Sequence, residues 1–166
     1  MKELVSVIIP FYRNANWLYE ALDSVVNQTY ENIEIVLVND GSKESVNLER
    51  YKAFRIKYIF QNNKGAAAAR NVGMRNSKGV YIAFLDSDDV WEKTKIEKQV
   101  NFLNNNLDYD WVHCSYKTFG SKKTKVINSS IENGMIYPNC LKTTKIGTPC
   151  LMIRRSVIVN SNYNFN

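Results

Sequence analysis

Acidic side chains crowd together directly after an apolar run in the middle of the chain. Asp86, Asp88 and Asp89 follow residues 80–85, with Ser87 between the first two. Carboxylates this close together repel one another unless a cation or strong donors neutralise them. Carboxylate oxygens suit Mg²⁺ or Mn²⁺, which proteins hold with one or two carboxylates and the phosphates of a substrate. The cluster therefore predicts a bound divalent cation, and Asp86 and Asp88, two residues apart, would point the same way in an extended stretch. The alternative is that Asp89 caps the next helix and the other two are solvated.

Polar turns also follow three earlier apolar runs. Pro10 and Tyr12 end the first run and Asp40 ends the second, while residues 62–65 end the third and lead into an alanine-rich segment that carries Arg70. Each feature alone has an ordinary structural interpretation, since an Asp-Gly-Ser turn after a strand commonly caps a helix. Because ligands of open α/β sheets bind outside the carboxyl ends of the strands, the four turns together predict one shared site.

The spacing of apolar residues predicts the elements that position these turns. β-branched runs predict strands, and apolar residues three and four apart predict helices. The predicted strands are 5–9, 33–38, 56–60, 80–85 and 111–119, with short strands or loop edges at 124–127, 134–137 and 149–153. The predicted helices start after Asn14 or Asn16, span 43–51 and 66–76, and run from about 91 to 104. This alternation predicts an open α/β fold with a mostly parallel sheet and helices on both faces.

Composition bounds the class of protein. The 166 residues are 45% hydrophobic and 23% charged with a net charge of +6, which predicts one globular domain that favours anionic partners. Three cysteines in no Cys-x-x-Cys arrangement predict neither a disulfide framework nor a zinc site, and favour a reducing, cytoplasmic location. The apolar runs are too short for a signal peptide or a membrane span. Neither a Gly-x-Gly-x-x-Gly nor a P-loop motif is present, which argues against those two nucleotide sites.

Read in order, the apolar runs and the polar turns that follow them resemble the N-terminal part of the family 2 glycosyltransferases, whose fold is called GT-A. The resemblance covers residues 4–103 strongly and 147–155 more loosely, and its last strong stretch carries the Asp-x-Asp of that family. The stretches that carry it are Val5–Tyr12, Asp23–Tyr30, Ile35–Ser42, Asn63–Gly73 and Tyr81–Asp89.

The resemblance implies metal-dependent transfer of a sugar from a nucleotide donor, commonly UDP-linked, to a saccharide or lipid-linked acceptor with inversion. Tyr12 would stack on the base and Asp40 would hydrogen-bond it. Arg70 would lie near the diphosphate or help to order Asp40. Asp86 would contact the ribose or the metal, and Asp88 would bind the Mn²⁺ or Mg²⁺. Pro10 and Ser87 complete the nucleotide-binding set, and the role in the bacterial cell would be cell-surface polysaccharide synthesis.

The same resemblance divides the chain. Residues 1–103 would form the donor-binding half of a single domain spanning 1–166, and 104–166 would begin the acceptor-side half of a longer enzyme. The catalytic base of the family lies in an acidic motif beyond the equivalent of 147–155. Between Trp111 and Asn166 the only carboxylate is Glu132, whose neighbours do not match that motif. We therefore expect the base beyond Asn166 and assign none within the chain.

Two further interpretations remain open at this point. One is a natural fragment that binds a nucleotide sugar without transferring it. The other is a non-enzymatic module whose basic face holds nucleic acid or anionic lipid. The preferred interpretation has no nucleic-acid partner, although peripheral contact with the inner face of a membrane is compatible with it. The basic residues available for such a face are Lys93, Lys95, Lys98, Lys122, Lys123, Lys125, Lys142, Lys145, Arg154 and Arg155.

Overall fold

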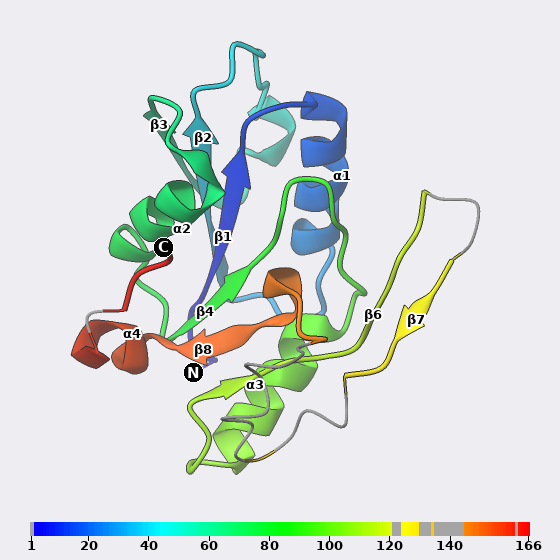
Figure 1. Cartoon of the computed structure of the whole chain (residues 1–166), viewed down its shortest axis with the longest axis vertical. Helices are drawn as coiled ribbons and strands as arrows, with labels where there is room; N and C mark the ends of the chain where they lie inside the picture. Colours follow the sequence, from blue (N-terminus) through cyan, green and yellow to red (C-terminus); the bar gives the residue numbers. More distant parts are fainter. Residues whose placement is uncertain (1, 121–123, 130–133, 135–144, 162) are drawn as a thin grey trace.

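The computed structural model describes residues 2–120, 124–129, 134, 145–161 and 163–166. Its strands are β1 (Val5–Phe11), β2 (Ile33–Asp40), β3 (Arg55–Gln61), β4 (Tyr81–Phe84), β5 (Trp111–Val112), β6 (Tyr116–Lys117), β7 (Val126–Ile127) and β8 (Met152–Arg154). Within these residues, six strands form a sheet in the order β3-β2-β1-β4-β8-β5, and β6 and β7 form a separate pair at its side (Figure 1).

Four neighbouring strands of the sheet are parallel. β1 pairs in parallel with β2 and β4, and β2 pairs in parallel with β3, whereas β8 runs antiparallel to both β4 and β5. The carboxyl ends of the four parallel strands therefore meet at one edge, which lies toward the top of Figure 1. The mostly parallel sheet is confirmed. The single strand predicted over 111–119 is wrong, because β5 and β6 belong to different sheets.

Helices cover both faces of this sheet, as expected. They are α1 (Ala15–Val26), α2 (Gly65–Arg75), α3 (Lys95–Asn105) and α4 (Arg155–Ser161), with 3₁₀ turns η1 (Glu49–Tyr51) and η3 (Thr148–Cys150). In Figure 1, α2 and α4 lie on one side of the strands and α1 and α3 on the other. Asn14 is the N-cap of α1, since its side chain accepts a hydrogen bond from the Trp17 amide at 3.3 Å.

Alternation along the strands divides the core into two layers. Val7 and Ile9 of β1 face α1 and α3, and Ile8 faces α2 and α4. Helix α2 approaches β1 so closely at Gly73 that an added Cβ would lie 2.3 Å from the Ile8 Cγ2. Glycine at this position therefore allows the short distance between α2 and the sheet. The first residue of α2 lies at the edge where the parallel strands end.

The helix predicted over 43–51 is wrong, because only η1 forms there. The Asn47 side chain takes a backbone amide that a helix would use. Its Oδ1 accepts at 2.9 Å from the Glu49 amide, which a helix would pair with the Ser45 carbonyl. The Ser42 Oγ accepts from the Glu44 amide at 3.1 Å, as an N-cap would, and does not compete. The local bond of Asn47 competes with helix formation, so the chain forms a bent connection between β2 and β3.

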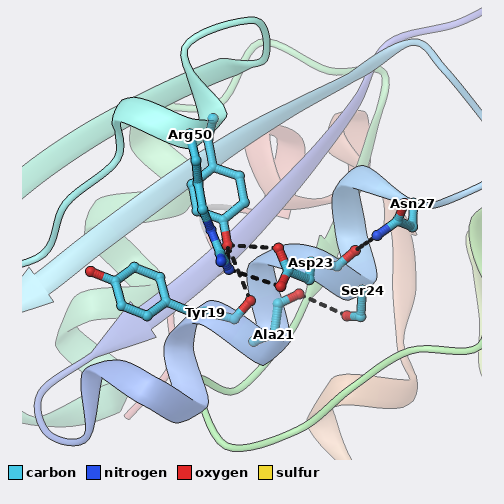
Figure 2. A network of polar contacts seen from close by, with 7 residues as sticks. Tyr19, Ala21, Asp23, Ser24, Asn27 and Arg50 are labelled. Atoms are coloured by element: carbon cyan, nitrogen blue, oxygen red, sulfur yellow. Dashed lines mark hydrogen bonds and ion pairs between the residues drawn. The ribbon is translucent and has the colours of Figure 1, made fainter.

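A polar network fixes this connection to α1 (Figure 2). Arg50 forms an ion pair with Asp23 at 2.8 Å. The Tyr51 hydroxyl donates to the Asp23 Oδ1 at 2.7 Å and contacts the guanidinium of Arg50. Because the Tyr51 ring is only 2% exposed, its hydroxyl depends on these partners, and the network holds the segment behind the Asp40 turn in place.

We expect Tyr51→Phe to destabilise the chain by about 1–2 kcal/mol, because Asp23 loses a buried donor. Burial and the bond to Asp23 raise the pKa of Tyr51 from 10.0 to about 12. The folded chain therefore keeps this proton over a pH range in which the unfolded chain loses it, so stability falls as pH rises from about 10 to about 12. Urea unfolding across pH checks both effects. Tyr116→Phe, at an exposed tyrosine, is the control, and a variant that unfolds like the wild type at every pH would contradict the account.

The remaining predicted elements are partly confirmed. The short strand predicted at 124–127 contains β7, which spans only 126–127. The stretch predicted at 149–153 divides into the end of η3 and the start of β8. Positions 135–137 of the predicted 134–137 strand lie outside the described residues. Helix α3 begins at Lys95, four residues later than Trp91. In the part of the chain that the structure describes, no helix is long and apolar enough to cross a bilayer.

Candidate functional site

Strand register brings the predicted turns together. Phe11, the last residue of β1, is opposite Asn39, and Tyr12 and Asp40 are the next residues along the chain. On the other side of β1, Ile8 is opposite Phe84, the last residue of β4, and Asp86 follows two residues later. The sequence therefore predicted correctly that these turns share one edge of the sheet.

Glu44 links the first two turns. Its carboxylate oxygens accept hydrogen bonds from the backbone amides of Asn14 and Ala15, both at 2.7 Å, and these bonds lower the pKa of Glu44. The two amides belong to the start of α1, where a carboxylate is favoured by the helix dipole. Tyr12 beside them is 41% exposed, and the guanidinium of Arg13 lies 4.9 Å from its ring centroid. Tyr12 thus presents an aromatic surface on a fixed loop.

Asp40 is held firmly at the end of β2. It is 3% exposed, and its Oδ1 accepts from the Gln61 Nε2 at 2.6 Å and from the Lys64 amide at 2.9 Å. Its Oδ2 accepts from the Gly65 amide at 2.8 Å, so the carboxylate joins the turn after β3 to the start of α2. A carboxylate has about four acceptor positions, and three are used by these bonds. One acceptor position, on the Oδ2, therefore takes no hydrogen bond from the described residues.

The residue after Asp40 must be glycine. Gly41 has a φ of +81°, and an added Cβ would lie 2.7 Å from the backbone nitrogen of Asn63. Both the left-handed backbone and the close approach exclude a side chain. The Asp-Gly pair therefore positions the Asp40 carboxylate against the turn after β3.

Arg70 pairs with Asp86 across the third and fourth turns. The guanidinium of Arg70, which is 14% exposed, donates to the Oδ1 of Asp86, which is 30% exposed. The same guanidinium lies 5.5 Å from the ring centroid of Phe165. Of the two roles expected for Arg70, the ordering of Asp40 is not what the structure shows, because Asp40 takes its hydrogen bonds from Gln61 and two backbone amides. The side chain instead fixes Asp86.

The acidic segment forms a turn. The Asp89 amide donates to the Asp86 carbonyl at 3.1 Å, so the extended stretch predicted to align Asp86 with Asp88 is wrong. Asp88 is exposed at the tip, after partly buried Ser87. Asp89 does not cap α3, whose N-cap is Thr94. Burial, then Asp88 and Asp86, raise the pKa of Asp89 to about 6.

This turn fits a cation that is shared with a ligand. Among the described residues, no group of three or more His, Cys, Asp and Glu side chains is gathered as a metal site. A Mg²⁺ or Mn²⁺ held by one or two carboxylates and by phosphate oxygens needs fewer protein ligands. Asp88, exposed at the tip of the acidic turn, meets that requirement, and Asp86 lies at the same turn although Arg70 occupies its Oδ1.

A depression of about 360 Å³ opens beside Asp88. Its other lining residues are Trp17, Glu20, Val90, Phe119 and Gly120. Trp17, in the first turn of α1, is 52% exposed, and Phe119 is 51% exposed. The sequence analysis missed these residues, although a tryptophan at the border of the apolar stripe of a helix is a signal that could have found Trp17. Exposed aromatic rings next to carboxylates can stack on a neutral, hydroxyl-rich ring and accept its hydrogen bonds.

The proposed basic face is reduced by the structure. Lys95 is only 8% exposed, and the guanidinium of Arg154 donates to the carbonyls of Leu103 and Tyr109. These two residues are therefore structural, which corrects their assignment to an exposed basic face. Lys122, Lys123, Lys142 and Glu132 lie outside the described residues.

Comparisons of the sequence identify a family. The model of the family "Glycosyl transferase family 2" matches residues 6–160. An uncharacterized glycosyltransferase of Rickettsia bellii is 41% identical over 89% of this chain and 22% of its own length. The Escherichia coli UDP-Glc:alpha-D-GlcNAc-diphosphoundecaprenol beta-1,3-glucosyltransferase WfaP is 35% identical over 98% of this chain and 65% of its own length. The chain thus spans only part of the curated relatives that it matches.

Solved structures share the fold. S. aureus TarS 1-349 in complex with UDP-GlcNAc matches 98% of this chain and 48% of its own, with a TM-score of 0.80 and 21% identity. The mannosyltransferase PcManGT from Pyrobaculum calidifontis, in complex with GDP-Man and Mn²⁺, matches 97% of this chain and 47% of its own, with a TM-score of 0.73 and 18% identity. The expected GT-A fold is confirmed by these matches.

Proposed function

Because the chain belongs to glycosyl transferase family 2, we propose that it binds a UDP-sugar at the edge where β1, β2 and β4 end and donates the sugar to an acceptor hydroxyl. One observation carries this proposal. β1 pairs in parallel with both β2 and β4, so the aromatic ring of Tyr12, the fixed carboxylate of Asp40 and the acidic turn that starts at Asp86 follow strand ends at one edge of the sheet. That order suits the base, ribose and diphosphate of a nucleotide.

The base is proposed to lie between the first two turns. Its ring stacks on the face of Tyr12 opposite Arg13, and an N–H of the base donates to the Oδ2 of Asp40. Uracil has one such N–H at its pairing edge, which matches the single acceptor position that remains on this carboxylate. This match supports a UDP-linked donor.

The diphosphate is proposed to lie beside the acidic turn, where Arg70 is paired with Asp86. Asp86, held by Arg70, contacts the ribose or the cation, and Ser87 and Asp88 face the phosphates from the turn. Bound Mn²⁺ or Mg²⁺ would stabilise the negative charge that gathers on the leaving nucleoside diphosphate. The positive charge of Arg70 acts in the same direction because it is fixed before the donor arrives. Inversion at the anomeric carbon is part of this proposal.

The acceptor is proposed to be a saccharide or a lipid-linked saccharide. The name of WfaP specifies an acceptor that is linked to diphosphoundecaprenol, which supports the lipid-linked class. Residues 1–103 would form the donor half, and the acceptor sugar would enter the depression beside Asp88 and stack on Trp17. No base for the acceptor hydroxyl is assigned within the described residues. The cytoplasmic location, the peripheral membrane contact and the role in cell-surface polysaccharide synthesis stay predictions.

We expect Trp17→Ala to weaken acceptor binding about tenfold, because stacking on an indole contributes about 1–1.5 kcal/mol. UDP binding should be unchanged, since Trp17 lies outside the proposed nucleotide path. Saturation-transfer NMR with a short-chain lipid diphosphate of N-acetylglucosamine measures the first effect, and calorimetry with UDP measures the second. Phe54→Ala, which removes a ring that is 45% exposed elsewhere, is the matched control. Equal acceptor signals from both variants would contradict the assignment of Trp17.

The proposed function as a whole is tested by nucleotide selectivity. The melting temperature is measured in Mn²⁺ with a series of tenfold dilutions of each nucleotide: UDP, UDP-GlcNAc, UDP-glucose, GDP and ADP. A ligand that binds only the folded state stabilises it by about 2.7 kcal/mol at 100 times its Kd. We expect the uridine nucleotides to raise the melting temperature at concentrations at least tenfold lower than GDP or ADP. No stabilisation by any nucleotide would contradict the proposal.

A further inference from the structure

Among the described residues, one lysine ammonium is buried at the start of α3 without a carboxylate partner. Lys95, the first residue of α3, is 8% exposed, and its Nζ donates to the Gln99 Oε1 at 2.7 Å. The same Nζ lies 4.0 Å from the centroid of the Trp91 ring. No Asp or Glu lies within ion-pair distance of it among the described residues. A buried charge without compensation is strongly unfavourable, so another group must offset it.

Two thiols provide the groups that can carry the opposite charge. Cys114, just after β5, and Cys150, at the end of η3, both interact electrostatically with Lys95. Cys114 is partly buried and Cys150 is 5% exposed. Both are free cysteines, although they are far apart in the sequence and no motif joins them. The fold therefore gathers two thiols around one buried ammonium.

Contacts with the backbone of η3 fix how the two cysteines lie. The Cys114 Sγ lies 3.8 Å from the Cys150 carbonyl oxygen, so the two residues are in contact. Gln99 donates to the same Cys150 carbonyl at 2.8 Å, and Trp91 donates from its Nε1 to the Pro149 carbonyl at 2.9 Å. η3 is thus held by Gln99 of α3 and by Trp91, just before α3, and Cys150 stays beside Cys114.

The arrangement shifts the pKa values of the two thiols in opposite directions. Cys150, followed by the ammonium of Lys95, lowers the pKa of Cys114. Cys114, followed by burial, raises the pKa of Cys150. Burial lowers the pKa of Lys95 to about 8, and the two cysteines oppose this shift. A thiolate is the nucleophilic form of cysteine, so the lower pKa favours Cys114 as the reactive thiol.

We propose that Cys114 and Cys150 form a reactive dithiol site, in which a Cys114 thiolate paired with Lys95 reacts with hydroperoxides and Cys150 then closes a disulfide. In the first step the Cys114 sulfur bonds to one oxygen of hydrogen peroxide, the O–O bond breaks, and hydroxide leaves and takes a proton from solvent. In the second step the Cys150 sulfur bonds to the Cys114 sulfur and the S–OH bond breaks, so that water leaves with the Cys150 proton. Two thiols are oxidised and one peroxide is reduced to two waters.

The first test measures the thiolate. In a Cys140→Ser background, iodoacetamide labelling is followed from pH 5 to 9 by mass spectrometry of the Cys114 and Cys150 peptides. An ordinary thiol has a pKa of about 8.5, so at pH 7 we expect Cys114 to react about tenfold faster than Cys150. Lys95→Met should remove most of this difference, and Lys95→Arg, which keeps the charge, should retain it. Equal labelling of the two thiols with an ordinary pH profile would overturn the proposal.

The second test measures the disulfide. One equivalent of hydrogen peroxide should lower the mass of the same protein by about 2 Da, and dithiothreitol should restore it. Cys150→Ser should instead accumulate a sulfenic acid at Cys114 that dimedone captures, and Cys114→Ser should react at least tenfold more slowly. Circular dichroism confirms that each variant is folded. Unchanged thiols, or dimedone capture at Cys150, would overturn the proposal. Neither test uses a nucleotide, so their results are independent of the proposed donor site.

Discussion

Asp88→Asn is expected to weaken Mn²⁺-dependent binding of UDP about 100-fold, which corresponds to about 2.7 kcal/mol. The substitution keeps the size of the side chain and removes the charge that a hard cation requires. Because Asp88 is exposed at the tip of its turn, the melting temperature without ligand should stay within about 1 °C of the wild type. Calorimetric titration of UDP with Mn²⁺ measures the affinity.

Asp108→Asn, an exposed carboxylate beyond α3, is the matched control and should bind UDP like the wild type. A titration in EDTA separates the contribution of the cation from that of Arg70 and Tyr12, which remain in the variant. If Asp88→Asn keeps the wild-type affinity in Mn²⁺, the cation is not bound at this turn.

Asp40→Ala is expected to lower the free energy of unfolding by about 3 kcal/mol and to abolish UDP binding. The substitution leaves the Lys64 and Gly65 amides and the Gln61 side chain without their acceptor in a buried position. Each buried donor without a partner costs about 1–3 kcal/mol, although solvent reaches part of this turn once the carboxylate is gone. Urea unfolding measures the stability.

Asp40→Asn separates the two roles of this side chain. Its carbonyl oxygen can still accept from Gln61 and Lys64, so we expect about half the loss of stability. The amide nitrogen then faces the Gly65 amide and offers no acceptor to a nucleobase, so UDP binding should be lost at a temperature where the variant is folded. Asp110→Ala, at an exposed carboxylate, controls for loss of charge. Wild-type stability of Asp40→Ala would show that the turn does not depend on the carboxylate.

The parallel part of the fold was predictable because its signals are local. Continuous β-branched runs such as 33–38 indicate strands that are covered on both faces, and the strand–helix alternation then fixes the topology. The shared edge at Tyr12, Asp40 and Asp86 follows from that topology alone. These positions are set by the chain order of the strands, which the sequence contains.

Other features depended on competition or on distant contacts. The 43–51 helix failed because Asn47 offers the Glu49 amide an alternative partner, and the acidic segment turns because Asp89 bonds back to Asp86. The pairing of Arg70 with Asp86 joins α2 to the end of β4, and no spacing in the sequence announces it.

The two clusters that sequence analysis missed share one cause. Lys95, Cys114 and Cys150 come from three elements, as do the residues around the depression beside Asp88, so each cluster exists only after folding. Lys95 in particular reads as a surface lysine in the sequence, and only its position against Trp91 shows that it is buried.

Calorimetric titration of the wild-type chain with UDP, in Mn²⁺ and again in EDTA, tests the central claim most directly. The account predicts one site per chain whose affinity falls at least tenfold when the cation is removed, because the diphosphate would share that cation with the acidic turn. Absence of binding under both conditions would contradict it, and would mean that this chain keeps the fold of the family without its donor site.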